Sequence, residues 1–390
     1  MFKGYKYRIY PTKEQADLIG KHIGSVRFIY NLALETKQKA WAGNRVYVGR
    51  YDLQPQLKDL KKDLKWLTEI NSQSLQSALI NLDFAYSQFF KGLSKFPTFK
   101  KKSNCGNFLV PQNVKLRGCK LIIPKFQEGI KIKIHRPIEG IIKQAAISLT
   151  PTGKYFASIL CDTGEVPPSK PIISEQTSVG VDLGIKNFAI TSDGEVIDNP
   201  KYLRKAQSKL KYVQRKYSKH KGRRTRHKLA ILHEKVANQR KDFLQKTSTR
   251  LIRENQTICL EDLNIKGMVK NHKLALSISD AGWGMFVDML EYKAGWYGRN
   301  ILKIGKFEPS SKTCSCCGAI NKDLTLKDRS WTCSECGVLH DRDINAACNI
   351  KSFALKNYVS GTDTQTRNEL PSLEGVMTSE ANPLCLSMGR

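Results

Sequence analysis

A short apolar strand that carries a carboxylate constrains this chain more than any other stretch. Residues 179–183 read Val-Gly-Val-Asp-Leu, which predicts a buried strand that contains Asp182. A second strand is predicted at 188–191, and Asp193-Gly194, a two-residue hairpin signal, leads into a third at 195–197. A carboxylate inside an apolar strand costs on the order of several kcal/mol unless a partner compensates it. Asp182 therefore requires a partner that folding supplies.

Two other carboxylates stand in similar settings. Glu261 ends the apolar run 257–260, and Asp343 opens the helical run 344–350. Three acids at strand ends and a helix start, far apart in sequence, predict one cation site assembled by folding. Asp262 and Asp341 are rival ligands, although Asp262 would point to the other face of its strand and Asp341 could instead cap the helix.

The order of the predicted elements indicates what this site could do. A strand and hairpin, then helices, a strand with Glu261, a helix, a strand and a helix with Asp343 suit an α/β ribonuclease-H-like fold. Carboxylates are ligands that Mg²⁺ prefers. Two Mg²⁺ ions about 3.5–4 Å apart can act on both oxygens of a phosphodiester displacement. The expected cofactor of the acids is therefore a pair of Mg²⁺ ions.

The charge of the chain indicates a polyanionic partner. The 390 residues carry 65 Lys and Arg against 35 Asp and Glu, a net charge of +30, which favours nucleic acid over a membrane surface. No run reaches the roughly 18 apolar residues of a membrane span, and the first residues lack the apolar core of a signal peptide. We therefore expect a soluble, cytoplasmic protein without a membrane partner, whose 11 cysteines do not form a disulfide framework.

Four of these cysteines have the spacing of a zinc ribbon. Two Cys-x2-Cys pairs, each followed by glycine, are separated by fifteen residues: Cys314, Cys317, Cys333 and Cys336. Four thiolates complete a closed tetrahedral shell, which predicts one structural Zn²⁺ with no position for a catalytic water. Cys316 lies within the first pair, but its adjacency to Cys317 does not give the two-residue spacing.

A basic helical hairpin is predicted at 201–250. This stretch has 18 Lys and Arg against two acids, and its apolar residues recur with helical spacing on both sides of a turn at 219–226. So much positive charge favours phosphate contact over a merely solvated face. We expect Arg223, Arg224 and Arg226 to contact nucleic acid.

The first half of the chain combines helices with short strands. A strand at 5–10 is followed by a helix that Thr12 and Gln15 begin with a capping box, and helical patterning continues to about residue 95. Short β-type runs at 105–165 predict a β-barrel or sandwich completed by the N-terminal strand, with the helices inserted into it. Two groups could contact nucleic acid here: Gln73 and Gln76 on a polar helix face, and Lys100 and Lys101 in a loop with aromatic residues.

Four motifs of the second half resemble one family in combination. They are Gly180-Val-Asp-Leu-Gly-Ile-Lys-Asn187, Leu260-Glu-Asp-Leu263, Ser310-Ser-Lys-Thr-Cys-Ser-Cys-Cys-Gly318 and His340-Asp-Arg-Asp-Ile-Asn-Ala-Ala347. They are similar to motifs of the TnpB (OrfB) proteins of bacterial insertion sequences, which are compact RNA-guided DNA endonucleases related to type V CRISPR effectors. The resemblance implies a RuvC nuclease whose acids are Asp182, Glu261 and Asp343. It also implies a guide RNA from the transposon end and a double-stranded DNA target cut beside a transposon-adjacent motif.

The resemblance also implies a domain layout. A β-barrel wedge domain would occupy 1–11 and 104–170, interrupted by a helical recognition lobe at 12–103. The RuvC-like nuclease domain would occupy 176–310 and 341–358, with the zinc ribbon inserted at 311–340. The end of the chain is rich in Ser, Thr, Gly and Pro and has no apolar period, which predicts a disordered tail at 359–390. Two alternatives remain open: a RuvC-like structure-specific nuclease that needs no RNA, and a zinc-ribbon DNA-binding regulator of transposition.

Overall fold

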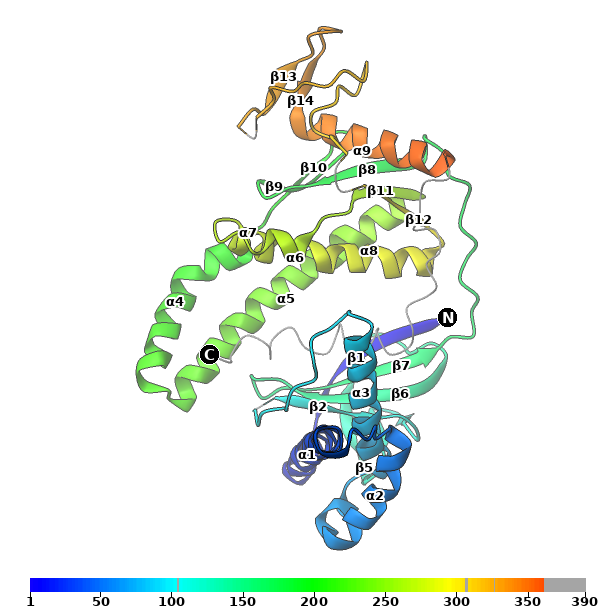
Figure 1. The fold of residues 1–390 in the computed structure, drawn as a ribbon, viewed down its shortest axis with the longest axis vertical. Coiled ribbons are helices and arrows are strands. Elements are labelled where there is room, and N and C mark those ends of the chain that lie inside the picture. The colour runs from blue at the N-terminus through cyan, green and yellow to red at the C-terminus, as the bar shows by residue number, and fades with distance from the viewer. Residues whose placement is uncertain (104, 306–307, 326, 361–390) are drawn as a thin grey trace. The chain divides into compact units, whose positions relative to one another are not determined.

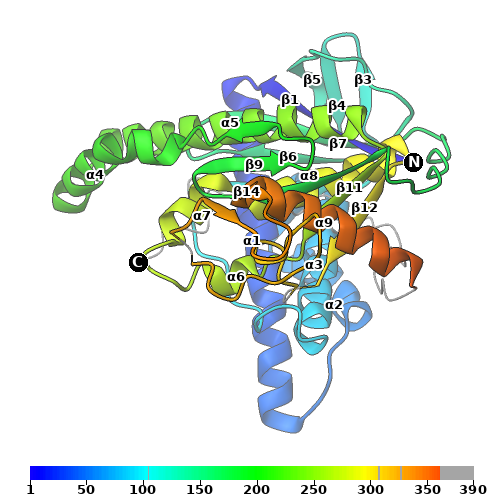
Figure 2. The ribbon, with the colours of Figure 1, turned by 90° about the horizontal axis from the view of Figure 1, so that it is seen from above.

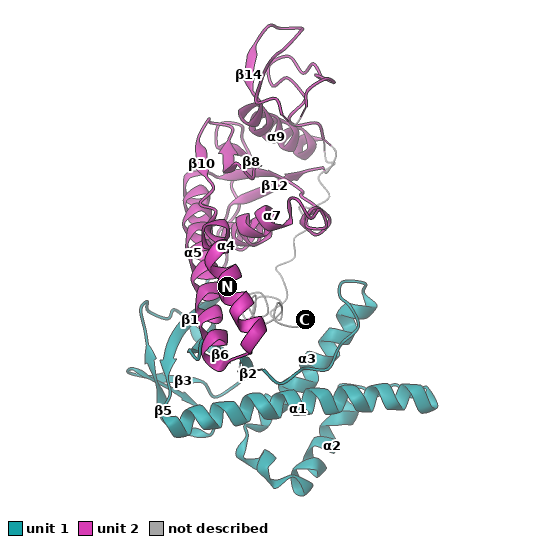
Figure 3. Cartoon of the chain, turned by 90° about the vertical axis from the view of Figure 1, so that its left-hand side faces the viewer, with its two compact units in different colours: residues 1–165, 372–390 teal, residues 166–371 magenta. Residues whose placement is uncertain are grey.

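The computed structural model describes residues 1–103, 105–305, 308–325 and 327–360. The tail predicted at 359–390 therefore lies outside the described residues, except for Val359 and Ser360 at the end of the last helix. The chain divides into two compact units, Met1–Glu165 and the described residues from Val166 onwards (Figure 3). Each unit is described by itself below.

The first unit contains a seven-stranded antiparallel sheet. In hydrogen-bonded order it reads β2-β6-β7-β1-β5-β4-β3, so the N-terminal strand β1 (Phe2–Tyr10) pairs with β7 (Tyr155–Asp162) on one side and β5 (Phe126–Lys133) on the other. The prediction that the N-terminal strand completes this sheet is confirmed, whereas its closure into a barrel stays a prediction. The other strands are β2 (Gly106–Val110), β3 (Lys115–Arg117), β4 (Lys120–Ile123) and β6 (Ile141–Leu149).

Three helices are inserted after β1, and the first and third of them pack against this sheet. They are α1 (Lys13–Asn44), α2 (Arg50–Asp63) and α3 (Ser72–Phe90), with a short 3₁₀ helix η1 (Lys65–Glu69) before α3. The predicted capping box is present at the start of α1: Thr12 accepts from the amide of Gln15, whose side chain accepts from the amide of Thr12. Alternating residues of β1, such as Tyr7 and Ile9, are buried in one core with the helices.

The second unit is built on a five-stranded mixed sheet in the order β10-β9-β8-β11-β12. Strands β8 (Ser178–Leu183), β11 (Thr257–Glu261) and β12 (Asn300–Ile304) are parallel, whereas β9 (Asn187–Thr191) and β10 (Val196–Asp198) continue from β8 as antiparallel hairpins. The strand and hairpin signals around Asp182 are thus confirmed. Gly194 takes the left-handed conformation that the second hairpin turn requires.

Helices cover both faces of this sheet (Figure 1). Helix α9 (Arg342–Val359) packs on one face through Ile350 and Ala354, and Figure 2 shows it crossing the strands. On the other face, α5 (Arg223–Glu254) and α8 (Trp283–Tyr297) bury an apolar core with Val181 and Leu260. The two faces of β8 and β11 therefore have different surroundings: one lies against the core with α5 and α8, and the other lies against α9.

The predicted basic hairpin consists of α4 (Tyr202–His220) and α5, joined at Lys221 and Gly222. Leu210, Val213 and Leu229 form a small core between the two helices. The start of α4 is capped from a distant element, because the carboxylate of Asp280 accepts from the amides of Leu203 and Arg204 at 2.8 and 3.0 Å. Asp280 belongs to α7 (Ala275–Ala281), which follows the single-turn helix α6 (Ile265–Met268).

A small two-stranded sheet, β13 (Ser330–Thr332) and β14 (Leu339–Asp341), precedes α9 and belongs to the cysteine-containing segment. Within the described ranges, the chain has no helix that is both long enough and apolar enough to cross a membrane.

Candidate active site and zinc-binding cluster

The fold brings Asp182, Glu261 and Asp343 together. β8 and β11 are parallel neighbours in which Val181 pairs with Leu260, so the next residues along, Asp182 and Glu261, leave the two strands side by side. Because Val181 and Leu260 point into the core with α5 and α8, side-chain alternation directs Asp182 and Glu261 to the face covered by α9. Asp343 lies in the first turn of α9 on that same face.

The pKa of Asp182 shows how strongly these acids interact. Removal from water raises the pKa of Asp182, and the charges of Glu261 and Asp343 raise it further, to about 7. The charge of Arg342 and the backbone amide of Leu183 act in the opposite direction but are outweighed. A carboxylate that is removed from water and has two other acids near it is a site that a cation would stabilise.

Each of the other two acids has a polar partner. Glu261 accepts a hydrogen bond from the hydroxyl of Ser310 at 2.6 Å through Oε1. Asp343 Oδ2 lies 3.6 Å from a guanidinium nitrogen of Arg329. These contacts constrain the two carboxylates but leave oxygens available to a cation.

The rival acids have other positions. Asp341 is the N-cap of α9, and its Oδ1 accepts from the amides of Asp343 and Ile344 at 3.0 and 3.1 Å, which is the capping role that the sequence left open. Asp262 follows the last residue of β11, and its amide donates to the carbonyl of Ile304. Asp341 thus positions the first turn of α9, where Asp343 lies.

The three carboxylates do not lie as close to one another as the ligands of a bound metal ion do. In the part of the chain that the structure describes, the groups whose potential ligand atoms all lie within 4.8 Å of one another consist of cysteines, with His340 in one of them.

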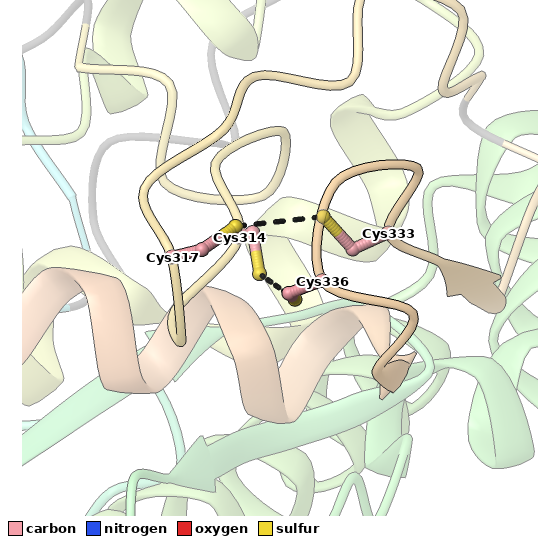
Figure 4. A group of neighbouring side chains, drawn as sticks. All are labelled: Cys314, Cys317, Cys333 and Cys336. Atoms are coloured by element: carbon pink, nitrogen blue, oxygen red, sulfur yellow. Dashed lines mark hydrogen bonds between the residues drawn. The ribbon is translucent and has the colours of Figure 1, made fainter.

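The cysteine cluster fits a zinc ion. Cys314, Cys317, Cys333 and Cys336 converge from two turns, as Figure 4 shows. The Sγ atoms of Cys314 and Cys336 are 3.6 Å apart, as are those of Cys317 and Cys333. Four thiolates around one zinc at about 2.3 Å would stand about 3.8 Å apart, so these four sulfurs could hold a zinc ion.

His340 is a member of this region to which the sequence assigned no role. It is buried on β14 beside Trp331, and its Nε2 lies 3.0 Å from the sulfur of Cys314. Burial raises the pKa of Cys314, but hydrogen bonds from the backbone of Cys317 and Cys316 and from His340 outweigh it and lower the pKa to about 5. The thiolate that a zinc ligand requires is therefore favoured at Cys314. At Cys336 in the same cluster, the backbone amide of Val338 lowers the pKa, but burial and hydrogen bonds with the neighbouring thiols outweigh it and raise the pKa to about 12.

The predicted nucleic-acid residues lie in varied settings. Arg223 and Arg224 are exposed in the first turn of α5, and Arg226 is half-buried one turn later. Lys101 and Gln76 are also exposed. The remaining two have protein partners: the ammonium of Lys100 lies 3.8 Å from the centre of the Tyr30 ring, and the Gln73 amide donates to Gln112 at 2.8 Å. All seven remain predicted contacts.

Gly180 lies in the first of the four sequence motifs, but its role is visible only in three dimensions. A Cβ atom at this position would lie 2.0 Å from the carbonyl oxygen of Ala347 in α9. Only glycine therefore lets α9 pack this closely on β8. A glycine inside a strand is the signal that could have predicted this close approach.

Comparison with known proteins identifies the family. A protein of Streptomyces pristinaespiralis named "Putative RNA-guided DNA endonuclease" is 38% identical over 378 residues, which cover 94% of this chain and 93% of the relative. The chain belongs to the TnpB (OrfB) family. The chain is also similar to "Putative RNA-guided DNA endonuclease InsQ" of Escherichia coli, which is 29% identical over 89% of this chain and 91% of the relative. A "TnpB-like protein" of Acanthamoeba polyphaga mimivirus is 25% identical over 90% of this chain and 73% of the relative.

Family models cover successive parts of this TnpB-family chain. Residues 162–272 match the model described as "Probable transposase", 283–350 match "Cas12f1-like, TNB domain", and 1–45 match "Helix-turn-helix domain". In this structure residues 1–45 form strand β1 and the single long helix α1. The third description therefore names a motif that differs from the strand and helix found here.

A solved structure shares the fold. The protein chain in "Cryo-EM structure of the Cas12f1-sgRNA-target DNA complex" matches with a TM-score of 0.56 over 87% of this chain and 83% of that chain, at 15% sequence identity. At this identity the likeness shows that the two chains share a fold.

Proposed function

We propose that this protein is an RNA-guided, Mg²⁺-dependent DNA endonuclease of an insertion sequence, acting in the cytoplasm of a prokaryote. Its partners would be a guide RNA from the transposon end and double-stranded DNA cut beside a transposon-adjacent motif. The convergence of Asp182, Glu261 and Asp343 from β8, β11 and α9 carries this proposal. The names of the curated relatives support the RNA-guided activity.

The proposal assigns a role to each part of the fold. The seven-stranded sheet would be the wedge domain, and α1–α3 the helical recognition lobe. The five-stranded sheet with α9 would be the RuvC-like nuclease domain of ribonuclease-H-like fold. Residues 311–340, with the cysteine cluster, would be the zinc ribbon inserted before α9.

The donor set at the acids suits Mg²⁺. Asp182, Glu261 and Asp343 would hold the metal, because all three offer carboxylate oxygens. A cation would also stabilise the ionised form of Asp182, whose pKa is raised to about 7 by removal from water and by the two neighbouring charges. Two Mg²⁺ ions held there would stabilise charge on the attacking and leaving oxygens of the phosphodiester. Asp182 must release its proton before it can act as a ligand, so metal binding should strengthen as the pH rises through about 7.

The distribution of charge on the first sheet supports a nucleic-acid partner. Cross-strand neighbours there carry the same charge: Arg8 pairs with Lys133, Lys120 with Lys131, and Lys120 with Arg117 on its other side. Like charges directly opposite each other destabilise a sheet. Such pairs are expected where a bound polyanion compensates them, and a phosphate backbone would do so.

Alanine variants of the three acids test the nuclease proposal. Asp182→Ala, Glu261→Ala and Asp343→Ala should each abolish cleavage of target DNA in Mg²⁺, while target binding by the loaded protein survives. Near-normal cleavage by Asp343→Ala with loss in Asp341→Ala would move the third ligand to Asp341. Cleavage by all three variants would exclude this site, and a protein that binds DNA without cutting it would be a zinc-ribbon regulator instead.

A further inference from the structure

Ser310 links an acid of the candidate active site to the zinc-binding segment. It follows β12 and precedes Cys314 by four residues, and only 6% of its surface is exposed. Its hydroxyl donates to Glu261 Oε1 at 2.6 Å, across 49 residues of sequence. A hydrogen bond to a carboxylate is charge-assisted and short, so it can hold the carboxylate in one rotational state.

Two buried asparagines of α9 hold the Ser310 segment. Asn349 Nδ2 donates to the carbonyls of Ser310 and Thr313 at 2.7 and 2.6 Å, and Asn345 Nδ2 donates to the carbonyl of Thr313 at 2.7 Å. The two side chains are four residues apart, so they share one face of the helix. They are 2% and 3% exposed, and buried amides are costly unless hydrogen-bonded, so these bonds fix the segment on α9.

The same helix carries Asp343, two residues before Asn345. Ser310 therefore connects Glu261 on β11 to the helix of Asp343, and β8 with Asp182 is hydrogen-bonded to β11. The connection continues into the cysteine cluster. The amide of Ser315 donates to Asn345 Oδ1, and the amide of Cys314 donates to the carbonyl of Ala319, which closes the turn that contains Cys314 and Cys317.

We propose that Ser310 is a positioning residue for Glu261, and that the folded, zinc-bound ribbon keeps Ser310 in place. The hydroxyl occupies one lone pair of Oε1, so Oε2 would supply a ligand atom when the metal is bound. This inference rests on the proposed function, because it assumes that Glu261 binds the catalytic metal. The structural zinc would therefore have a second effect: it would strengthen metal binding by the active-site acids.

Direct metal binding tests the role of Ser310 without RNA, DNA or turnover. The probe is Mn²⁺, and free Mn²⁺ is measured by electron paramagnetic resonance with the full-length, zinc-loaded chain. Ser310→Ala should weaken Mn²⁺ binding roughly 10-fold or more, the lower end of the loss seen when groups around metal ligands are removed. Ser310→Thr, which keeps the hydroxyl, should recover most of the affinity, and Ser311→Ala is the matched control.

The outcomes separate this inference from the proposed function. Wild-type Mn²⁺ affinity in Ser310→Ala, with loss of binding in Glu261→Ala, would overturn the role of Ser310 alone. Unchanged binding in Glu261→Ala would instead refute the metal site. Should Ser310→Ala fail to fold or lose zinc, Ser310→Cys keeps the size of the side chain with a weaker donor, and wild-type affinity in that variant would equally contradict the inference.

A double-mutant comparison tests the connection to zinc. Cys333→Ser, which removes a zinc ligand, should also weaken Mn²⁺ binding roughly 10-fold. If zinc acts through Ser310, the combination with Ser310→Ala should be no weaker than either variant alone, because both remove the same support. If the losses of Mn²⁺ affinity in the two single variants multiply in the combined variant, the ribbon does not act through this serine. Wild-type Mn²⁺ affinity in Cys333→Ser would lead to the same conclusion.

Discussion

Asp182→Asn should abolish metal binding and at the same time stabilise the metal-free protein. The fold raises the pKa of Asp182 from 3.8 to about 7 through loss of water contact and the charges of Glu261 and Asp343. A shift of about 3 pKa units corresponds to about 4 kcal/mol of folding free energy once the carboxylate is ionised. Because Asp182 is only half-buried, we expect about 2–4 kcal/mol at pH 8.

The direction of the pH dependence follows from the raised pKa. The folded state binds the Asp182 proton more tightly than the unfolded chain, so the metal-free wild type loses stability as the pH rises from about 4 to about 7. Asparagine has nearly the same shape and no charge, so the variant lacks this loss. Its advantage over wild type should be small near pH 4, grow up to about pH 7 and stay constant above it.

Thermal unfolding in EDTA, at several pH values, measures this difference. For a unit of roughly 200 residues the predicted free energy corresponds to a rise in Tm of roughly 4–16 °C at pH 8. Asp198→Asn, an exposed acid on β10 of the same sheet, is the matched control and should leave Tm unchanged. Added Mg²⁺ should raise the Tm of wild type but not that of Asp182→Asn. An unchanged or lower Tm for metal-free Asp182→Asn at pH 8 would refute the electrostatic reasoning.

Three further changes have defined outcomes. Cys333→Ser should reduce zinc from about one ion per chain to none and unfold the ribbon locally, as metal analysis and proteolysis would show; full zinc occupancy would contradict the four-cysteine site. Gly180→Ala should separate α9 from β8 and weaken Mn²⁺ binding at least 10-fold, and wild-type binding would show that the helix adapts. Neutralising Arg223, Arg224 and Arg226 should weaken nucleic-acid binding without changing which sequence is cut. The slope of log affinity against log salt concentration should become shallower by roughly 0.7–0.9 for each phosphate contact that is lost.

The convergence of the acids was predictable because it depends on local pattern and strand order. Asp182 is the penultimate residue of β8 and Glu261 is the last residue of β11, and both strands have apolar residues with a period of two. The parallel pairing of the two strands brings these acids side by side. The spacing of the cysteines predicted their cluster for the same reason, since each pair lies within one turn. In both cases the decisive pattern lies within one strand or one turn, so neighbouring residues in the sequence are enough to predict it.

Other features depend on contacts that no local pattern encodes. Ser310 reaches Glu261 and Asp280 caps α4 only because distant elements pack together. The loop lysine Lys100 was predicted to contact nucleic acid, yet its ammonium also lies on the ring of Tyr30. The sequence shows that Lys100 is cationic, but only the packing of α1 against the loop determines that its ammonium lies on the Tyr30 ring.

Cleavage with exchanged guides tests the RNA-guided activity most directly. Two plasmids carry different target sequences beside the same transposon-adjacent motif, and the guide segment of the bound RNA is exchanged between them. We predict that each guide directs Mg²⁺-dependent cutting of its own plasmid only, and that Asp182→Ala cuts neither. If the cut plasmid does not change with the guide, or if RNA-free protein cuts both equally well, the protein is an RNA-independent nuclease.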